Sequence, residues 1–447
     1  MAGMDALLAW VPESARSAVR TRYLRVNDLN LHFLEALPTA TLAEESKQRL
    51  VILLHGFPEL GYSWRKVLYP LSEAGYHVIA PDQRGYGRTT VVDESGGPAA
   101  PVNGKIRFED DLAPFRMMNL VKDVVSLVYA LGYESAAAVV GHDFGSLVAG
   151  YCSLIRPDVF RSVVMMSAPF PGAPLLPCSR SSNVSGGPSL GDMAAVLNQQ
   201  LAALDPPRKH YTLYFSSPEA NEELTNPPGG LSSFLQGYFR AKSADWEGNQ
   251  PHPLLSPSAD NLATMPRYYI MLLNETMPQA IRGCLQQRVG DEGHDDRDTP
   301  LAWLPDEDCA VYIAEYERTG FQGGLNWYRC MTDAKWSLDL QIFSGKRISV
   351  PAMFLSGKQD WGTYQSPGTA DRMRTRICDR MEEENFVLIA GAGHWVQQEQ
   401  SSEVVKHLLR FFSKVRPTST YRNALLIEPE DIHRTRSKVV SICDDSL

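Results

Sequence analysis

The stretch VVGHDFGSLVAG, residues 139–150, has the pattern of a strand that turns sharply into a helix, with Asp143 at the centre of G-x-D-x-G. The apolar run AAAVV (136–140) predicts the strand, and SLVAGYCSLI (146–155) predicts the helix. Glycines on both sides let the turn close while the residue between them projects above the sheet. The stretch therefore predicts a nucleophile elbow with Asp143 as its reactive side chain.

An aspartate at this point favours a different reaction from the serine that hydrolases usually carry there. A serine oxygen attacks acyl carbon, whereas a carboxylate displaces a leaving group from saturated carbon and is itself esterified. Water must then cleave that ester, so the expected substrates are electrophilic alkyl compounds such as epoxides or haloalkanes. The structural alternative is that Asp143 only caps the helix that follows it.

The rest of the chain predicts the sheet that this elbow needs. Alternating apolar and polar residues at 21–37 predict a β-hairpin that turns at Asn27-Asp28. Continuous apolar runs separated by helix-like segments predict an α/β fold with a mostly parallel central sheet covered by helices. These runs are RLVILLHG (49–56), YHVIAPD (76–82), AAAVVGHD (136–143), FRSVVMMSAP (160–169), VPAMFLSG (350–357) and NFVLIAGAGH (385–394).

A gap of about 180 residues between the fourth and fifth runs breaks this rhythm. We therefore expect an inserted helical cap, or lid, that divides the α/β core into two parts. The expected segments are the first part of the core (1–170), the cap (171–345), the second part of the core (346–415) and a C-terminal tail (416–447).

Within the cap, helical periodicity is expected over LATMPRYYIMLLNETM (262–277) and DCAVYIAEYERTGF (308–321). Residues 171–192 are rich in Pro, Ser and Gly, which is typical of a loop, and the acidic run 290–299 lacks EF-hand spacing. Gly187-Pro188-Ser189-Leu190-Gly191 matches G-x-S-x-G, but no strand precedes it and a proline lies inside it. We therefore reject it as a serine hydrolase motif.

Composition excludes several other classes of protein. With 447 residues, a formal charge of −9 and scattered Lys and Arg, the chain has no basic face for nucleic acid. Its seven cysteines are odd in number and widely spaced, which suits a reducing compartment. No stretch is long and apolar enough for a secretory signal or a membrane span, so the cytoplasm is the expected location.

A carboxylate nucleophile needs a base for the second step, and His394 has the best sequence context among the histidines. It follows the last apolar strand in AGAGHWVQQE, where the carboxyl edge of a parallel sheet would bring it near the elbow. Asp360, in LSGKQDWG after the preceding strand, is the expected acid that orients it. The alternatives are a packing histidine beside Trp395 and a helix-capping aspartate.

Backbone N–H groups of Phe57, in HGFPEL, and of Phe144 could bind the oxyanion formed when water attacks the Asp143 ester. An ordinary proline turn is the alternative for Phe57. A metal site built from His55, His142 and Asp143 would need compatible geometry, and the expected reaction requires neither a metal nor a cofactor. The segment PDQRGYGRT (81–89) lacks the phosphate-binding arrangement, so we assign it a structural role.

Taken together, these motifs resemble those of the soluble epoxide hydrolase branch of the α/β-hydrolase superfamily over nearly all of residues 20–415. The matching motifs, in order, are HGFPE (55–59), QRGYG (83–87), GHDFG (141–145), HYTLYF (210–215), GFQGGLNWYR (320–329), KQD (358–360) and GHW (393–395). The resemblance implies that Asp143 is the nucleophile and that His394 and Asp360 activate water. It also implies that Tyr211 and Tyr328 hold the epoxide oxygen.

The tyrosines also make chemical sense independently of the resemblance. Opening an epoxide generates an alkoxide, and a phenol with a pKa of about 10 stays protonated at neutral pH and can donate to it. Taken singly, either tyrosine is better explained by packing in the lid, and its motif context reverses that preference. The expected product is a vicinal diol, and the expected substrate pocket is aromatic, lined by Phe57, Phe144, Trp327, Trp361 and Trp395.

Two other functions share parts of this pattern. A haloalkane or haloacid dehalogenase uses the same aspartyl ester, but Phe144 stands where a halide-binding tryptophan or a carboxylate-binding arginine would be expected. Trp327 and Trp361 keep that alternative open. A non-catalytic receptor that closes its lid on a ligand is the third reading. The natural epoxide and the oligomeric state stay open, with a homodimer among the options.

Overall fold

The computed structural model describes residues 7–38, 49–92, 105–176, 190–286 and 301–415. The expected loops at 177–189 and 290–299 and the tail after 415 lie outside these residues. Residues Met1–Phe412 form one compact unit, and Ser413–Leu447 form a second, of which only the end of the last helix is described.

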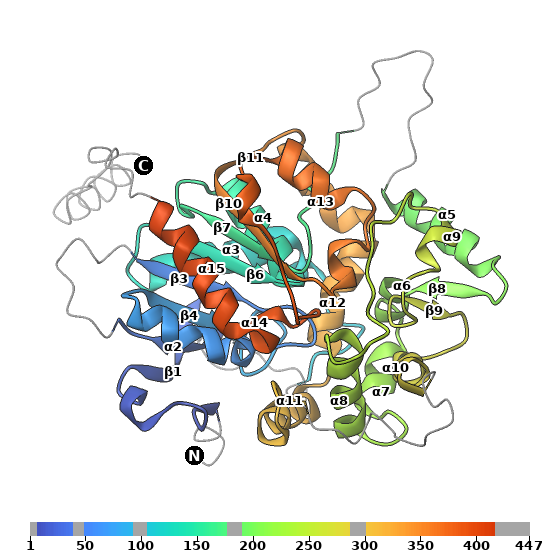
Figure 1. Ribbon diagram of the computed structural model, residues 1–447, viewed down its shortest axis with the longest axis horizontal. Helices are drawn as coiled ribbons and strands as arrows, with labels where there is room; N and C mark the ends of the chain where they lie inside the picture. Colours follow the sequence, from blue (N-terminus) through green and yellow to red (C-terminus); the bar gives the residue numbers. More distant parts are fainter. Residues whose placement is uncertain (1–6, 39–48, 93–104, 177–189, 287–300, 416–447) are drawn as a thin grey trace, which may run out of the picture. The chain divides into compact units, whose positions relative to one another are not determined.

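The core of the first unit is a mostly parallel sheet that runs in the order β1-β2-β4-β3-β6-β7-β10-β11 (Figure 1). Antiparallel pairing joins β1, β2 and β4, and the remaining neighbours along this order pair in parallel. The strands on this path are β1 (Val19–Val26), β2 (Leu29–Ala36), β3 (Leu50–Leu54), β4 (His77–Pro81), β6 (Ala138–His142), β7 (Val163–Met166), β10 (Ile348–Gly357) and β11 (Cys378–Arg380). Off the path, β12 (Phe386–Ile389) pairs with β10, and β5 (Thr90–Val91) pairs with β2.

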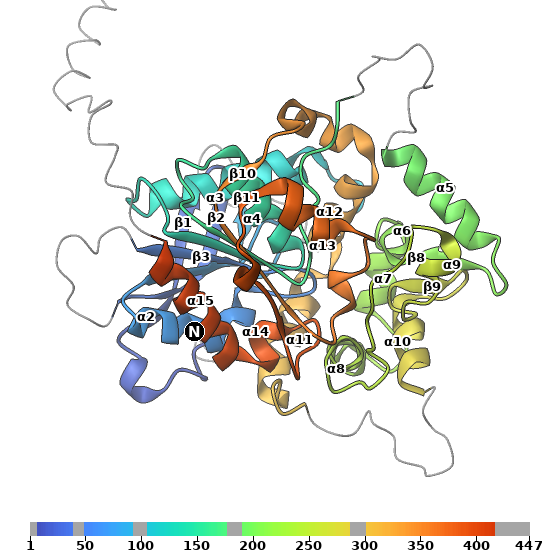
Figure 2. The same ribbon diagram turned by 45° about the horizontal axis from the view of Figure 1, so that its top comes forward.

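The strands form where the sequence predicted them. Every residue of β3, β4, β6 and β7 is buried, because helices cover both faces of the sheet. Figure 2 shows α2 and α15 on one face and α3 and α4 on the other. The core helices are α2 (Arg65–Glu73), α3 (Met117–Ala130), α4 (Phe144–Ile155), α13 (Thr369–Arg372), α14 (Val396–Glu399) and α15 (Ser401–Lys414).

Between β7 and β10 the chain leaves the sheet and forms a mainly helical segment, which we call the lid (190–286 and 301–343). Its elements are α5 (Leu190–Ala202), β8 (Arg208–His210), α6 (Tyr211–Phe215), α7 (Ala220–Thr225), α8 (Leu231–Lys242), α9 (Ala259–Leu262), β9 (Ile270–Leu272), α10 (Met277–Gln286), α11 (Asp306–Thr319), α12 (Gln322–Thr332) and the 3-10 segment η7 (Ala334–Phe343).

The expected helix at 308–321 is confirmed by α11, but the helix expected at 262–277 is wrong. That segment contains the end of α9, turns and the strand β9, which pairs antiparallel with β8. Pro266 lacks the N–H that a helix would need at this position. The segment instead pairs with a strand far away in the sequence, although its apolar residues are spaced as in a helix. Among the described helices, none has the length and apolar character needed to cross a membrane.

Candidate active site

Asp143 lies at the sharp turn between β6 and α4, with φ of 53° and ψ of −119°. A non-glycine residue with positive φ is strained by about 1–3 kcal/mol, and such strain persists only where the surroundings hold it. A Cβ at Gly141 would overlap the carbonyl oxygen of Gly145, and one at Gly56 would overlap the Asp143 side chain. The glycines therefore admit the turn, and Asp143 projects toward the loop after β3.

Two other strand ends bring His394 and Asp360 to the same edge of the sheet. The Nε2 atom of His394 lies 3.4 Å from Oδ2 of Asp143, and its Nδ1 atom lies 3.1 Å from Oδ1 of Asp360. His394 is 1 % exposed and Asp360 is 2 % exposed, so bulk water screens these contacts little. The structure thus brings together the three side chains that separate motifs predict as nucleophile, base and orienting acid.

Asp360 also caps the short 3-10 helix η8 (Trp361–Thr363), because its side chain accepts a hydrogen bond from the Gly362 N–H at 2.7 Å. Its other carboxylate oxygen accepts from the Ser356 hydroxyl at 3.0 Å. Capping and contact with His394 therefore occur together, and the cap fixes the direction of the carboxylate.

Electrostatics keep both carboxylates ionised. Burial alone would raise the pKa of Asp143, but the nearby His394, followed by the charge of Lys242, holds it well below its usual range. Burial likewise opposes ionisation of Asp360, and His394 outweighs it and lowers the pKa of that carboxyl. A carboxylate that stays ionised at neutral pH is available as a nucleophile.

One of the two predicted oxyanion donors binds the Asp143 carboxylate. The Phe57 N–H donates to Oδ1 of Asp143 at 3.0 Å. Phe144 is the first residue of α4, so its N–H has no partner within the helix. With Oδ1 bound to Phe57, Oδ2 is the oxygen that faces His394.

The two lid tyrosines come from different elements and meet over this site. Tyr211 begins α6 and Tyr328 lies on α12, and their ring centroids are 5.9 Å apart. Burial, followed by the charge of Asp143, raises the pKa of both phenols. Both therefore keep their protons at neutral pH, and the Tyr211 hydroxyl donates to Oε1 of Gln365 at 3.3 Å.

The five predicted aromatic lining residues are all buried, but they make different contacts. Phe57 and Phe144 pack edge-on against Tyr328, at 5.4 Å and 4.9 Å between centroids. The indole N–H of Trp327 donates to the Arg84 carbonyl at 3.0 Å, and that of Trp395 donates to the Phe239 carbonyl at 2.8 Å. The Trp361 ring packs against the His252 ring.

A buried pair behind the nucleophile was not predicted from the sequence. Nδ1 of His142 lies 2.5 Å from Oε2 of Glu59, and its Nε2 donates to the His394 carbonyl at 2.6 Å. Burial opposes the charge on His142, but Glu59 outweighs it and raises the pKa of the imidazole. The available signal was the position of both residues inside the motifs HGFPE and GHDFG.

This network also bears on the metal alternative. Both ring nitrogens of His142 are engaged, as are those of His55, which bind the Gly56 carbonyl and the Gln83 N–H. These histidines therefore have no lone pair directed at a metal beside Asp143. Within the described residues, no cluster of His, Cys, Asp and Glu has the arrangement of a metal site.

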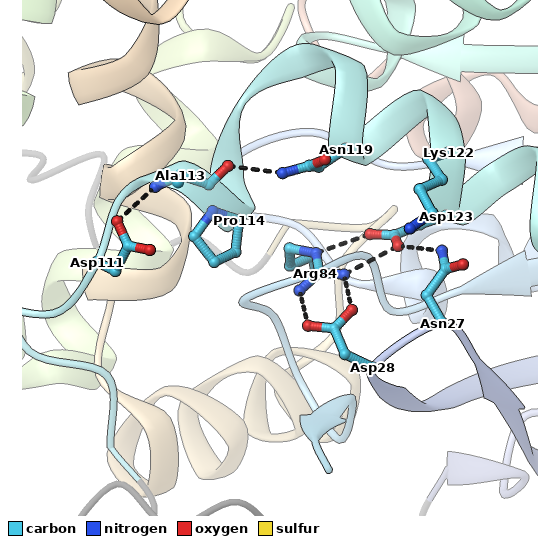
Figure 3. A pocket seen from close by; sticks show the side chains of 9 residues that line it. All are labelled: Asn27, Asp28, Arg84, Asp111, Ala113, Pro114, Asn119, Lys122 and Asp123. Atoms are coloured by element: carbon cyan, nitrogen blue, oxygen red, sulfur yellow. Dashed lines mark hydrogen bonds and ion pairs between the residues drawn. The ribbon is translucent and has the colours of Figure 1, made fainter. Parts of the chain in front are cut away.

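A polar cavity of about 350 Å³ opens elsewhere in the core, beside the β1–β2 turn (Figure 3). Its most buried charge, Arg84, is saturated by two carboxylates: both Asp28 oxygens accept from it at 2.6 Å and 2.9 Å, and both Asp123 oxygens at 2.7 Å and 2.9 Å. The cavity contains none of the predicted site residues. Arg84 anchors the QRGYG loop, in agreement with the structural role expected for it.

Comparison with known proteins agrees with this geometry. Residues 49–400 match the alpha/beta hydrolase fold family. The chain is 32% identical to epoxide hydrolase A of Mycobacterium tuberculosis (strain ATCC 25618 / H37Rv) over 372 residues, which is 83% of this chain and 92% of that protein. It is 29% identical to epoxide hydrolase 3 of Siraitia grosvenorii over 370 residues, 82% of this chain and 92% of the relative.

Solved structures give the same result. An epoxide hydrolase from an endophytic Streptomyces superposes with a TM-score of 0.66 at 26% identity, covering 89% of this chain and 96% of that one. Epoxide hydrolase I of potato (Solanum tuberosum) superposes with a TM-score of 0.59 at 28% identity, covering 89% and 99%. On the strength of the family match, the relatives and the superpositions, this chain belongs to the epoxide hydrolases of the alpha/beta hydrolase fold.

Proposed function

We propose that the chain converts an epoxide to a vicinal diol through an ester on Asp143. In the first step, Oδ2 of Asp143 forms a bond to a ring carbon and the carbon–oxygen bond of the ring breaks. The resulting alkoxide takes a proton from Tyr211 or Tyr328, which leaves a phenolate in the lid. A phenol can supply this proton because the alkoxide is far more basic than a phenolate.

In the second step, His394 takes a proton from water as the water oxygen attacks the carboxyl carbon of the ester. The N–H groups of Phe57 and Phe144 stabilise the negative oxygen that develops. When this intermediate collapses, the alkyl oxygen leaves with the proton held by His394, and the diol is complete. The new Asp143 carboxyl carries the second water proton, which returns to the lid phenolate.

The observation that best supports this proposal is the position of Asp143 between an N–H donor and an imidazole. Phe57 binds Oδ1 at 3.0 Å, and His394 lies 3.4 Å from Oδ2. One oxygen is thus bound as the future carbonyl, and the other is directed at the site of alkylation. The base lies beside the ester that it must help water to cleave.

The experiment is to measure whether an ester accumulates when the base is removed. We expect His394→Gln to form an adduct with the mass of the epoxide on intact-mass spectrometry, because alkylation proceeds and hydrolysis stalls. Asp143→Ala should form no adduct and no diol. Epoxide consumption by His394→Gln with no adduct would refute the covalent scheme.

An isotope experiment tests the same step from the product side. With enzyme in excess in H₂¹⁸O, the first diol should contain no heavy oxygen, because one of its oxygens comes from Asp143. A labelled first product would contradict the proposal. Chloride release from haloalkanes tests the dehalogenase alternative. We expect none, because the Trp327 N–H is bound to the Arg84 carbonyl and a halide would have only the Trp361 N–H left of the two indole donors.

Two expectations about organisation belong to this proposal. We infer that residues 171–345 act as a cap that carries Tyr211 and Tyr328 over a core formed by 1–170 and 346–415. We also infer a cytoplasmic location, in support of which the described cysteines are all free: Cys152, Cys284, Cys309, Cys330 and Cys378.

A further inference from the structure

Lys242, the last residue of α8, is a buried cation that the proposed mechanism leaves without a role. Its residue is 5 % exposed. Its Nζ atom lies 5.3 Å from the ring centroid of Tyr238, 5.2 Å from that of Tyr269 and 5.4 Å from that of Trp395. Cation–π contacts with desolvated rings offset part of the cost of burying the charge.

The aromatic rings take the place of an ion-pair partner. Among the described residues, no ion pair within 4.0 Å joins Lys242 to a carboxylate. Burial lowers the pKa of the Lys242 amine. The nearby carboxylates of Asp143, Asp360 and Glu59 act in the opposite direction, because each of them favours the protonated amine. The ammonium therefore acts on the carboxylates of the site through its charge, and it forms no ion pair with any of them.

The backbone of Lys242 also contacts the catalytic loop. Its carbonyl accepts a hydrogen bond from the His394 N–H at 2.8 Å. A Cβ at Gly393 would overlap this same carbonyl, so the lid chain lies directly on the loop. The Trp395 ring centroid lies 4.6 Å from that of His394 and 5.4 Å from the Lys242 Nζ atom.

We infer that Lys242 is a positioning residue whose ammonium favours hydrolysis of the Asp143 ester over its formation. The inference rests on the proposed function. During alkylation the negative charge leaves Asp143 and appears on oxygen held by the lid tyrosines. During hydrolysis the charge returns to the carboxyl group, first as the tetrahedral oxyanion and then as the carboxylate.

A fixed positive charge near Asp143 affects these two half-reactions in opposite directions. It stabilises the ionised carboxylate and so raises the barrier to alkylation, and it stabilises the oxyanion and so lowers the barrier to hydrolysis. The charge of Lys242 contributes to the low pKa of both Asp143 and Asp360.

The test compares Lys242→Met and Lys242→Arg in rapid single-turnover kinetics with a chromogenic aryl epoxide. We expect Lys242→Met to hydrolyse the ester about tenfold more slowly while alkylating at an equal or higher rate, so the ester accumulates. Lys242→Arg keeps the charge and should restore hydrolysis in large part.

The matched control is Lys209→Met, which removes another lid lysine with a cation–π contact. The Nζ atom of Lys209 lies 5.2 Å from the Tyr214 ring, and the carboxylates near it are Glu223, Glu275 and Glu219. We expect both half-reactions to keep the wild-type rates in this variant. A general loosening of the lid would slow alkylation and hydrolysis together, and would not be rescued by arginine.

The outcomes separate this inference from the proposed function. If wild-type enzyme forms the diol and His394→Gln accumulates the ester, but Lys242→Met keeps the wild-type ratio of the two rates, Lys242 has no such role. The same conclusion follows if both rates of Lys242→Met fall equally while its thermal unfolding is unchanged. If His394→Gln forms no ester, the covalent mechanism itself fails first.

Discussion

Tyr211 and Tyr328 come from different lid helices and their rings meet, which leads to a prediction about the first half-reaction. We expect Tyr211→Phe and Tyr328→Phe each to slow alkylation by about 10²-fold, because one phenol can still protonate the alkoxide. The double variant should nearly stop it. Single-turnover fluorescence or absorbance with excess enzyme measures this rate, and ester hydrolysis should change less.

Tyr214→Phe is the control for these variants, since Tyr214 lies three residues further along α6 and its ring contacts Lys209. It should alkylate at the wild-type rate. An unchanged alkylation rate in the Tyr211/Tyr328 double variant would mean that another acid protonates the epoxide oxygen.

At the scale of single residues, the sequence predicts the reactive groups better than the groups that support them. Asp143, Asp360 and His394 each follow an apolar strand, and the carboxyl ends of parallel strands meet at one edge. Lys242, at the end of a lid helix, does not show this signal, whereas Glu59 shows it, since Glu59 follows β3 as closely as His394 follows β12. Their roles depend on contacts with residues far along the chain, such as the pairing of Glu59 with His142, 83 positions away.

At the scale of elements, continuous apolar runs predict β3, β4, β6 and β7 because both faces of these strands are buried. Short elements of the lid are harder to predict. The strands β8 and β9 have three residues each and are defined by their mutual pairing. The local pattern over 262–277 therefore predicts a helix, but pairing of β9 with β8 makes part of this segment a strand.

The β1–β2 hairpin supplies a prediction about acid stability. Glu35 on β2 is fully buried, and it accepts hydrogen bonds from Arg20, Arg22 and His77. Burial would raise its pKa, but the hydrogen bonds from His77 and Arg20 lower it to about 2. Because the folded pKa lies below the unfolded value of about 4.3, this stabilisation is complete above the unfolded value and is lost as the pH falls toward 2.

Glu35→Gln should therefore lower the unfolding temperature at pH 7. Between about pH 4.3 and 2, the unfolding temperature of this variant should fall less steeply with pH than that of the wild type. Thermal unfolding followed by circular dichroism across this range measures the effect. Glu307→Gln, which neutralises an exposed carboxylate on α11, should keep the wild-type slope. An equal slope in Glu35→Gln and wild type would show that Glu35 does not drive the acid transition.

At the scale of the whole first unit, the lid and the core are joined by a buried ion pair. Arg65 on α2 is 1 % exposed, and its Nε and Nη2 atoms donate to Oδ2 of Asp308 on α11 at 3.0 Å and 2.7 Å. The Tyr62 hydroxyl donates to the other Asp308 oxygen at 2.6 Å, and a third Arg65 nitrogen, Nη1, donates to Oε1 of Gln398 at 2.7 Å. The lid is thus tied to the segment that follows His394.

Removing either partner leaves a buried charge without compensation, which costs about 3–5 kcal/mol, whereas removing both can be nearly neutral. We therefore expect Arg65→Met and Asp308→Asn each to lower the unfolding temperature strongly, and the double variant to lower it by much less than the sum. The single variants should also raise KM by a larger factor than the factor by which they lower the rate of ester hydrolysis. The lid is held less firmly in these variants, whereas Asp143 and His394 both belong to the core and keep their distance. Additive losses across the double-mutant cycle would mean that Arg65 and Asp308 stabilise their own elements independently and that this pair does not close the lid.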